Sequence, residues 1–446
     1  VCIGIVGESA EPIDVLALKV GFFANANYMY NNRYYADFVY RLSGSSKFGS
    51  NQRYGQFWSG GLGWNLHNEN FLKFEKLNLL KIRGSVGYTG KVNFEPFQSI
   101  TMYKYENTLE YLHGIGAIPQ TICNDDLKWE REFSYNIGAD ISLFDRRLNA
   151  TLDFYLKRTK DLVLDASIAP STGVVSGKQN IGEMENKGFE FSVDGFIIQR
   201  NDVWWQLGMN GSTNKNRILK ISNALKRQNE LNNDVAPTRQ TPAPLAQYEE
   251  GESTSALKVV RSAGIDPATG REVFIKLDGT RTFTYSADDK VVVGDTDPRF
   301  YGNVYTNVFY KGFSLYIMGS FKCGGYLYNV TRASRVEGTT GRTNVDRRAF
   351  DSRWKEVGDI ALYRNITEHS VPQQTDRFVE KENVLTITSV NLGYEFPQRI
   401  CQKMMLRNLR LGVNLSDILR FSNVKVERGL DYLYGNGFEF TLSTTF

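Results

Sequence analysis

The end of the chain carries the feature that most limits its fold. Residues 438–446 alternate between apolar and polar side chains, and Phe438, Phe440, Leu442 and Phe446 share one face of the extended segment. Chain termini of soluble domains are usually polar and frayed. An apolar-out, polar-in final strand is typical of a transmembrane β-barrel. An edge strand of a soluble sandwich has the same pattern, so the rest of the chain must decide.

The same alternation recurs along the chain, with apolar positions such as Ile137, Phe154 and Val413 each next to a polar residue. Each run has about the 9–11 residues that a tilted strand needs to cross a bilayer, whereas soluble strands typically have about 5–6. The pattern predicts an all-β, antiparallel transmembrane barrel portion of about thirteen strands. The expected strands are 16–30, 33–43, 54–66, 79–89, 131–144, 147–158, 187–199, 203–213, 301–311, 313–323, 384–397, 405–416 and 437–446.

The connections between these strands alternate in length. Those expected at one end are 31–33, 67–78, 144–147, 200–202, 311–312 and 398–404; those at the other are 44–53, 90–130, 159–186, 214–300, 324–383 and 417–436. Bacterial barrels place short turns in the periplasm and long loops outside. The first group is therefore predicted to be periplasmic. Because such barrels have even strand numbers, an odd count predicts that at least one earlier strand is absent, and that this chain alone does not close a barrel.

Composition agrees with a barrel. Hydrophobic residues make up 41%, mean hydropathy is −0.37, and no apolar run approaches the length of about 18 residues that a spanning helix needs. Aromatic residues reach 13%, as interfacial girdles require. A net charge of +4 is too small to indicate nucleic-acid binding. Residues 1–7 lack the features of a secretory signal, so we expect the amino end to be incomplete.

Several motifs in family order give a specific resemblance. They are RLSGSSKFG at 41–49, NQRYG at 51–55, GW at 63–64, LKIRGSVGYTG at 80–90, WE at 129–130, NIG at 136–138, DFYLKRTKDL at 153–162, NKGFE at 186–190, GIDPATG at 264–270 and GDTDPRFYG at 294–302. Together they resemble the carboxy-terminal barrel portion of SusC-like transporters, which are TonB-dependent outer-membrane proteins of the starch-utilisation-system type.

The resemblance implies a function and partners. Residues 1–446 correspond to the carboxy-terminal part of a barrel of about twenty-two strands, with the plug domain and the early strands absent. The expected function is active import of an oligosaccharide or another nutrient across the outer membrane. A SusD-like surface lipoprotein would cover the mouth, and the TonB complex would act through the missing plug. The ligand would be a glycan or a peptide, the barrel would contact outer-membrane lipid, and no cofactor, catalytic residue or metal site is expected.

Two sets of aromatic residues are candidate functional sites. Tyr103, Tyr105, Tyr111 and Trp129 lie in or beside a long outer connection and are candidates for stacking on a sugar ring or packing on a peptide. Packing within their own loop, or against the lid, explains them equally well.

The second set lies in the final strand. Phe438, Phe440 and Phe446 are expected to form the signal for membrane insertion and to anchor the strand in lipid. Anchoring alone is the alternative.

Two other functions remain as alternatives. One is a structural barrel or adhesin that does not transport, and the other is a secreted all-β carbohydrate-active enzyme. For the enzyme, Asp125, Asp126 and Glu130 would be the paired acids. Glycoside hydrolysis needs a fixed separation between two carboxylates, which loop residues at the mouth of a barrel are poorly suited to hold, so we do not expect an enzyme.

Overall fold

A computed structural model describes most of the chain. The described residues are 3–6, 18–72, 74–111, 114–167, 173–174, 176–235, 243–339, 345–425 and 435–445. Among them, no helix is both long and apolar enough to cross a bilayer.

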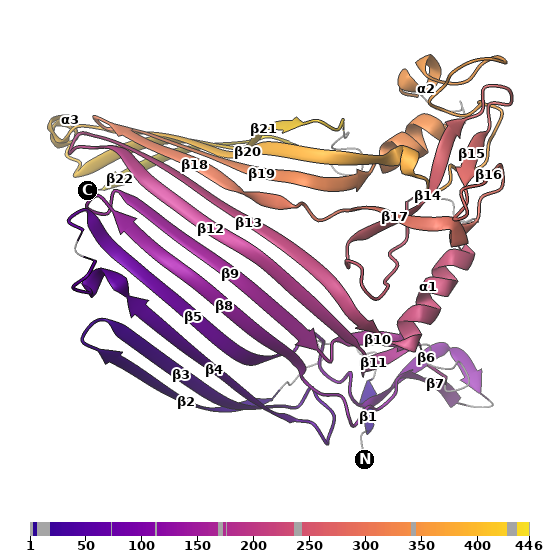
Figure 1. Ribbon diagram of the computed structural model, residues 1–446, viewed down its shortest axis with the longest axis horizontal. Coiled ribbons are helices and arrows are strands. Elements are labelled where there is room, and N and C mark those ends of the chain that lie inside the picture. The colour runs from indigo at the N-terminus through magenta and orange to yellow at the C-terminus, as the bar shows by residue number, and fades with distance from the viewer. Residues whose placement is uncertain are drawn as a thin grey trace.

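One curved antiparallel sheet dominates the structure (Figure 1), and its thirteen strands are neighbours in chain order. The strands are β2 (Lys19–Tyr30), β3 (Tyr34–Ser45), β4 (Tyr54–Asn65), β5 (Leu77–Lys91), β8 (Glu130–Leu143), β9 (Leu148–Lys160), β12 (Gly182–Gln199), β13 (Val203–Ile221), β18 (Phe300–Tyr310), β19 (Phe313–Tyr328), β20 (Val379–Glu395), β21 (Asn408–Ser422) and β22 (Gly437–Thr445). Every predicted strand is present, and the predicted fold class is confirmed. In the described part of the chain β2 and β22 are the sheet edges, so the sheet is open, as expected.

The short connections gather at one end of the sheet, on the left in Figure 1. Asn31 and Asn32 join β2 to β3 with φ of 50° and 54°, and Lys311 and Gly312 join β18 to β19 with φ of 45° and 95°. Two positive φ values in succession make the hairpin turn whose twist matches that of the strands. All the shortest connections lie at the predicted end, but the alternation of lengths is not strict, because 46–53 at the loop end is shorter than 66–76 and 396–407 at this end.

Cross-strand pairs place the apolar residues on one continuous face. Ile137 pairs with Phe154, and Phe154 with Phe189, whose ring centroid lies 4.6 Å away. Ile137 and Phe154 remain 63% and 60% exposed, because no other part of the described chain covers this face. We call it the apolar face, and the opposite one the polar face. A large exposed apolar surface of this kind requires lipid or a partner.

Five strands extend further than the sequence pattern indicates. The carboxyl ends of β13, β19 and β21 and the amino ends of β12 and β20 continue by about five residues or more toward the long loops. In the extension of β13 both faces carry polar residues, as in Asn214-Lys215-Asn216-Arg217, whereas the extension of β19 carries Tyr326, Leu327 and Tyr328. The hydrogen-bond ladder continues there, while the apolar alternation stops because the strand has passed beyond the apolar band.

The long connections fold into smaller elements. β1 (Ile3–Val6) pairs with β6 (Thr101–Tyr111), which pairs with β7 (Gly114–Thr121), and β10 (Val163–Ser167) pairs with β11 (Ser176–Asn180). A four-stranded sheet contains β14 (Ala256–Ile265), β15 (Glu272–Ile275), β16 (Arg281–Thr282) and β17 (Lys290–Asp295). The helical elements are η1 (Leu66–Asn68), α1 (Asn223–Val235), η4 (Ala287–Asp289), η5 (Arg332–Glu337), α2 (Arg348–Asp351), η6 (Asp376–Phe378) and α3 (Gln398–Lys403).

Two of these connections form one folded unit at the loop end of the sheet. We call it the loop module; it comprises the described parts of 256–295 and 329–378, and it lies at the right of Figure 1. Its core contains Leu257, Val259, Ala333 and Phe378, packed on Tyr328 at the end of β19. Burial of this core holds the two connections against the sheet.

A buried ion network also joins the two connections. Arg377 donates to both carboxylate oxygens of Glu272 at 2.7 Å and to Glu337 at 2.7 Å. Arg364 donates to the same Glu337 oxygen at 2.7 Å. Arg353 donates instead to backbone carbonyls, among them that of Glu337. The side chain of Glu337 is fully buried, so its charge depends on these partners.

Replacing Glu337 tests this network. Glu337→Ala leaves the guanidinium groups of Arg364 and Arg377 without their shared carboxylate, and breaking a buried pair typically costs about 3–5 kcal/mol. We expect the backbone amides of β14 and β15 to exchange hydrogen for deuterium faster, by the factor that this loss of free energy corresponds to. Asp351→Ala is the control, because Asp351 forms an exposed i,i+4 pair with Arg347 that is worth about 0.3–0.5 kcal/mol. Equal exchange in the two variants would contradict this assignment.

Candidate functional site

The polar face of the sheet forms one wall of the expected lumen. A hollow of about 430 Å³ lies on it, across β9, β12, β13 and β18. Its lining includes Asp153, Glu190, Asn210, Tyr301 and Asn303, all at alternating positions opposite the apolar face. Carboxylate, amide and phenol groups suit a polar ligand with many hydroxyl or amide groups.

An ion network stiffens the wall beside this hollow. Arg83 of β5 donates to Asp140 of β8 at 3.3 Å and to Asp153 of β9 at 2.6 Å. Gly138 lies between them, where a Cβ would be 2.5 Å from Asp153 Oδ1 and 2.8 Å from Arg83 Cζ. Glycine is therefore needed for the three strands to share the arginine. Asp153 Oδ1 is buried without a hydrogen-bond partner among the described residues.

Further hydrogen bonds extend the wall toward β13 and β18. Asp194 accepts from Asn149 at 3.2 Å and from Gln206 at 3.3 Å. The rings of Tyr305 and Tyr316 lie 6.1 Å apart on the same face. The polar face thus offers a surface of fixed polar groups, which can bind a ligand without first reorganising.

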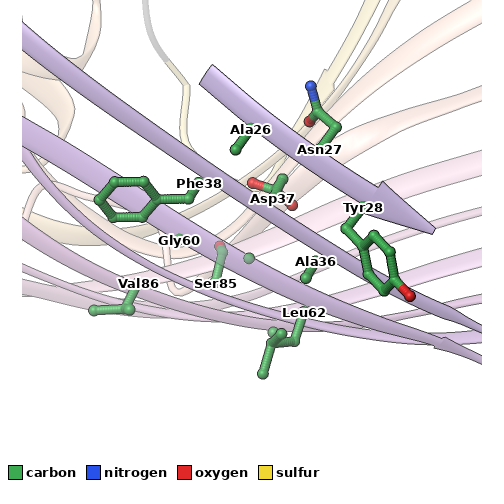
Figure 2. Close-up of a pocket in the computed structure, with 12 residues that line it drawn as sticks. Ala26, Asn27, Tyr28, Ala36, Asp37, Phe38, Gly60, Leu62, Ser85 and Val86 are labelled. Atoms are coloured by element: carbon green, nitrogen blue, oxygen red, sulfur yellow. The ribbon is translucent and has the colours of Figure 1, made fainter. Parts of the chain in front are cut away.

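A larger hollow lies on the other side of the sheet. It is a groove of about 770 Å³, and Figure 2 shows that its Leu62 and Val86 point away from the side that bears Asn27. Gly60 and Gly84 leave space between these apolar side chains. Because the groove opens on the apolar face, it belongs to the predicted lipid-facing surface and not to the ligand path.

The predicted aromatic residues of the long loops have different surroundings. Tyr103 and Tyr105 lie on the same side of β6 and are 38% and 40% exposed, so they remain available for stacking. Tyr111 ends β6, and its side chain lies outside the described part. Trp129 packs on Phe48 at a ring distance of 4.3 Å, and its indole donates to the Arg53 carbonyl at 3.2 Å. Trp129 therefore helps to hold its own loop in place.

The predicted aromatic residues of the last strand lie on the apolar face. Phe438 pairs with Leu415 and Phe440 with Val413, and both phenylalanines are largely exposed. Phe446 lies outside the described residues.

The candidate acids of the enzyme alternative have structural partners. Glu130 is buried, and it accepts from the Val163 backbone at 2.9 Å and from Asn93 at 3.1 Å. Asp126 accepts from Asn51 at 3.1 Å. These bonds hold neighbouring loops together.

One buried cation in the loop module escaped the sequence analysis. The Lys290 ammonium is buried, with no hydrogen-bond partner in the part of the chain that is described. Burial, assisted by the charge of Lys258 and opposed by Asp288, lowers the pKa of Lys290 to about 8. The burial of this lysine depends on contacts between distant loops, so no local pattern indicates it.

Comparison with known proteins identifies the family. The model of the family "TonB dependent receptor-like, beta-barrel" matches residues 13–414. TonB-dependent receptor P3 of Formosa agariphila is 28% identical over 91% of this chain and 41% of its own length. TonB-dependent receptor SusC of Bacteroides thetaiotaomicron is 35% identical over 46% of this chain and 21% of its own. The chain thus spans about two fifths of the length of the first of these relatives.

Solved structures show the same fold. A structure of the RagAB peptide transporter superposes with a TM-score of 0.79 at 24% identity, covering 92% of this chain and 44% of that chain. A second, of the RagAB peptide importer in an "open-open" state, has a TM-score of 0.74 at 25% identity, covering 91% and 43%. From the matched family, the relatives and the open antiparallel sheet, we conclude that this chain belongs to the TonB-dependent receptor β-barrel family, as a SusC-like protein of the outer membrane.

Proposed function

We propose that this chain is the carboxy-terminal barrel part of an importer that takes up an oligosaccharide or a peptide across the outer membrane. The observation that supports this proposal most is the polar face, where Asp153, Glu190 and Asn210 surround a hollow on an otherwise continuous wall. A barrel that served only as a scaffold does not need a lumen-facing hollow lined by fixed hydrogen-bonding groups.

The proposed mechanism needs a plug inside the barrel and a lid over its mouth. A plug domain outside this chain closes the lumen, and the TonB complex pulls on that plug to open a path. A SusD-like lipoprotein covers the mouth and releases ligand toward the polar face. The loop module and β6 lie at the loop end of the sheet, where such a lid makes contact. SusC and RagAB, as similar proteins, support this arrangement.

Within this mechanism, Tyr103 and Tyr105 are proposed ligand contacts at the mouth. They are exposed neighbours on one side of β6, and each aromatic contact with a ring is worth about 0.5–1.5 kcal/mol. In the full-length receptor, the double variant Tyr103→Ala with Tyr105→Ala is expected to raise the half-saturating concentration for uptake of labelled ligand by about tenfold. A panel of labelled oligosaccharides and peptides identifies the ligand class.

The uptake experiment has two controls. Tyr310→Ala removes an exposed tyrosine at the opposite end of the sheet, and it is expected to leave uptake unchanged. Collapse of the proton-motive force is expected to abolish uptake by the unmodified receptor. Uptake that survives the collapse, or its absence for every labelled ligand, would contradict active import and favour a structural barrel or adhesin.

We also propose that the aromatic end of β22 is the signal for membrane insertion. Phe438 and Phe440 lie on the apolar face of this edge strand, and Phe446 continues the same alternation in the sequence.

Deleting Phe446 from the full-length receptor tests the signal. We expect the membrane-inserted fraction, measured as the heat-modifiable folded band, to fall severalfold. Replacing Phe154 by Leu is the control, because Phe154 is an exposed aromatic residue of the apolar face on a different strand, β9. If deletion leaves insertion normal and only lowers the unfolding midpoint slightly, Phe446 is an anchor and not a signal.

A further inference from the structure

A group of basic residues lies on the apolar side of the sheet, just beyond the apolar band on the loop end. Alternation from Phe133, Phe154, Phe189 and Met209 places these residues on the outward side of four adjacent strands, β8, β9, β12 and β13. We call the group the basic rim; it consists of Arg131, Arg158, Lys160, Lys187, Lys215 and Arg217.

The height of the rim follows from strand geometry. Lys187 lies twelve residues from the end of β12 at Gln199, and Lys215 lies twelve residues from the start of β13 at Val203. At about 3.3 Å per residue and a tilt of about 40°, twelve residues rise about 30 Å. The apolar band of an outer-membrane barrel is about 25 Å tall. Both lysines therefore lie at the level of the outer headgroups.

Two lysines of the rim face each other without a counter-ion. Lys187 and Lys215 are directly opposite in the β12–β13 ladder, where Cβ atoms are about 5 Å apart. Both are exposed, and neither has an ionic partner among the described residues. Like charges directly opposite destabilise a sheet, so an anion bound between the two strands would relieve the repulsion of this pair.

Acidic residues offset only part of the rim. Glu183 forms an ion pair with Arg158 at 3.1 Å, and Asp161 is paired with Arg131. Glu185 lies opposite both Arg158 and Arg217 in the ladders. Glu183 also lies directly opposite Lys160, so Lys187 and Lys215 remain as the positive surface on the outward side that no acidic residue faces in the ladders.

A groove lined by both apolar and charged residues lies directly beside these cations. It has a volume of about 490 Å³, and its floor contains Tyr88, Phe133, Tyr135 and Leu156. Arg131, Arg158, Lys160 and Glu185 complete its lining, and Leu156 lies directly opposite Lys187 in the β9–β12 ladder. The floor is continuous with the apolar face through Ile137 and Phe154.

We propose that the basic rim and this groove bind a phosphate-bearing lipid of the outer leaflet. The cations contact the phosphate group through charge-assisted hydrogen bonds, and an acyl chain lies in the groove and continues down the apolar face. The combination of cations above and apolar side chains below favours a lipid over free phosphate, which has no use for the groove. A protein partner would instead need a surface that is not already at the bilayer interface.

The test uses the full-length receptor, purified from outer membranes in a mild detergent. Diphosphorylated lipid A and its dephosphorylated form are the probes, and native mass spectrometry measures the retained fraction of each. The unmodified receptor is expected to prefer the phosphorylated form. A lysine near an anionic lipid surface contributes about a fivefold factor in affinity. The double variant Lys187→Gln with Lys215→Gln is therefore expected to lose about twenty-five-fold in affinity for diphosphorylated lipid A.

Three controls make the result specific. Lys76→Gln with Lys311→Gln removes two exposed lysines at the short-turn end, and it is expected to leave affinity unchanged because these residues face the other leaflet. Lys187→Arg with Lys215→Arg keeps the charge and is expected to keep binding. Inorganic phosphate alone is expected to compete poorly. The heat-modifiable band shows whether each variant folds.

Three outcomes would overturn the proposal. One is equal retention of the two lipid forms, and another is unchanged affinity in the folded Lys→Gln double variant. The third is loss of a co-purifying protein with lipid retention intact, which would assign the rim to a protein interface. If the Lys→Gln double variant does not fold, Arg158→Gln with Lys160→Gln tests the same site from β9, and unchanged affinity there would equally reject it.

Discussion

The rest of the structure depends on the two-residue alternation of a paired strand. Thirteen strands pair in chain order. The register of each pair determines which side chains of the next strand lie on the same face, so the apolar side chains all lie on one face. A shift of one residue would turn Phe154 toward the lumen and Asp153 toward lipid. Burying a charged group in hydrocarbon costs several kcal/mol. The register is therefore set by the lipid as much as by the hydrogen bonds.

The same alternation explains where function can reside. Outward positions within the apolar band face lipid, so at that height fixed polar groups such as Asp153, Asn210 and Tyr301 can gather only on the other face. The loops beyond the band are free of this constraint. They fold into a module with its own apolar core and a buried ion network around Glu337. The proposed ligand path, the proposed lid contact and the apolar face thereby occupy three different surfaces of one chain.

The fold could be predicted from the sequence because lipid and water impose a repeating pattern. All thirteen strands, and the position of the shortest connections at one end, follow from it. The extended ends of β13 and β19 could not be predicted, because both faces of those segments contact water or other loops. The role of Trp129 at the candidate site could not be predicted either. Its contacts with Phe48 and Arg53 join segments that are distant in the sequence, so no local sequence pattern indicates them.

Site-directed spin labelling along β9 tests the central claim most directly. Residues 151–156 of the full-length receptor are replaced one at a time by a spin-labelled cysteine, with the native cysteines changed to serine. Labels at Leu152, Phe154 and Leu156 should collide mainly with oxygen dissolved in lipid. Labels at Thr151, Asp153 and Tyr155 should collide mainly with a water-soluble nickel complex. Equal accessibility of the two sets, or a period near the roughly 3.6 residues of a helix, would contradict the account.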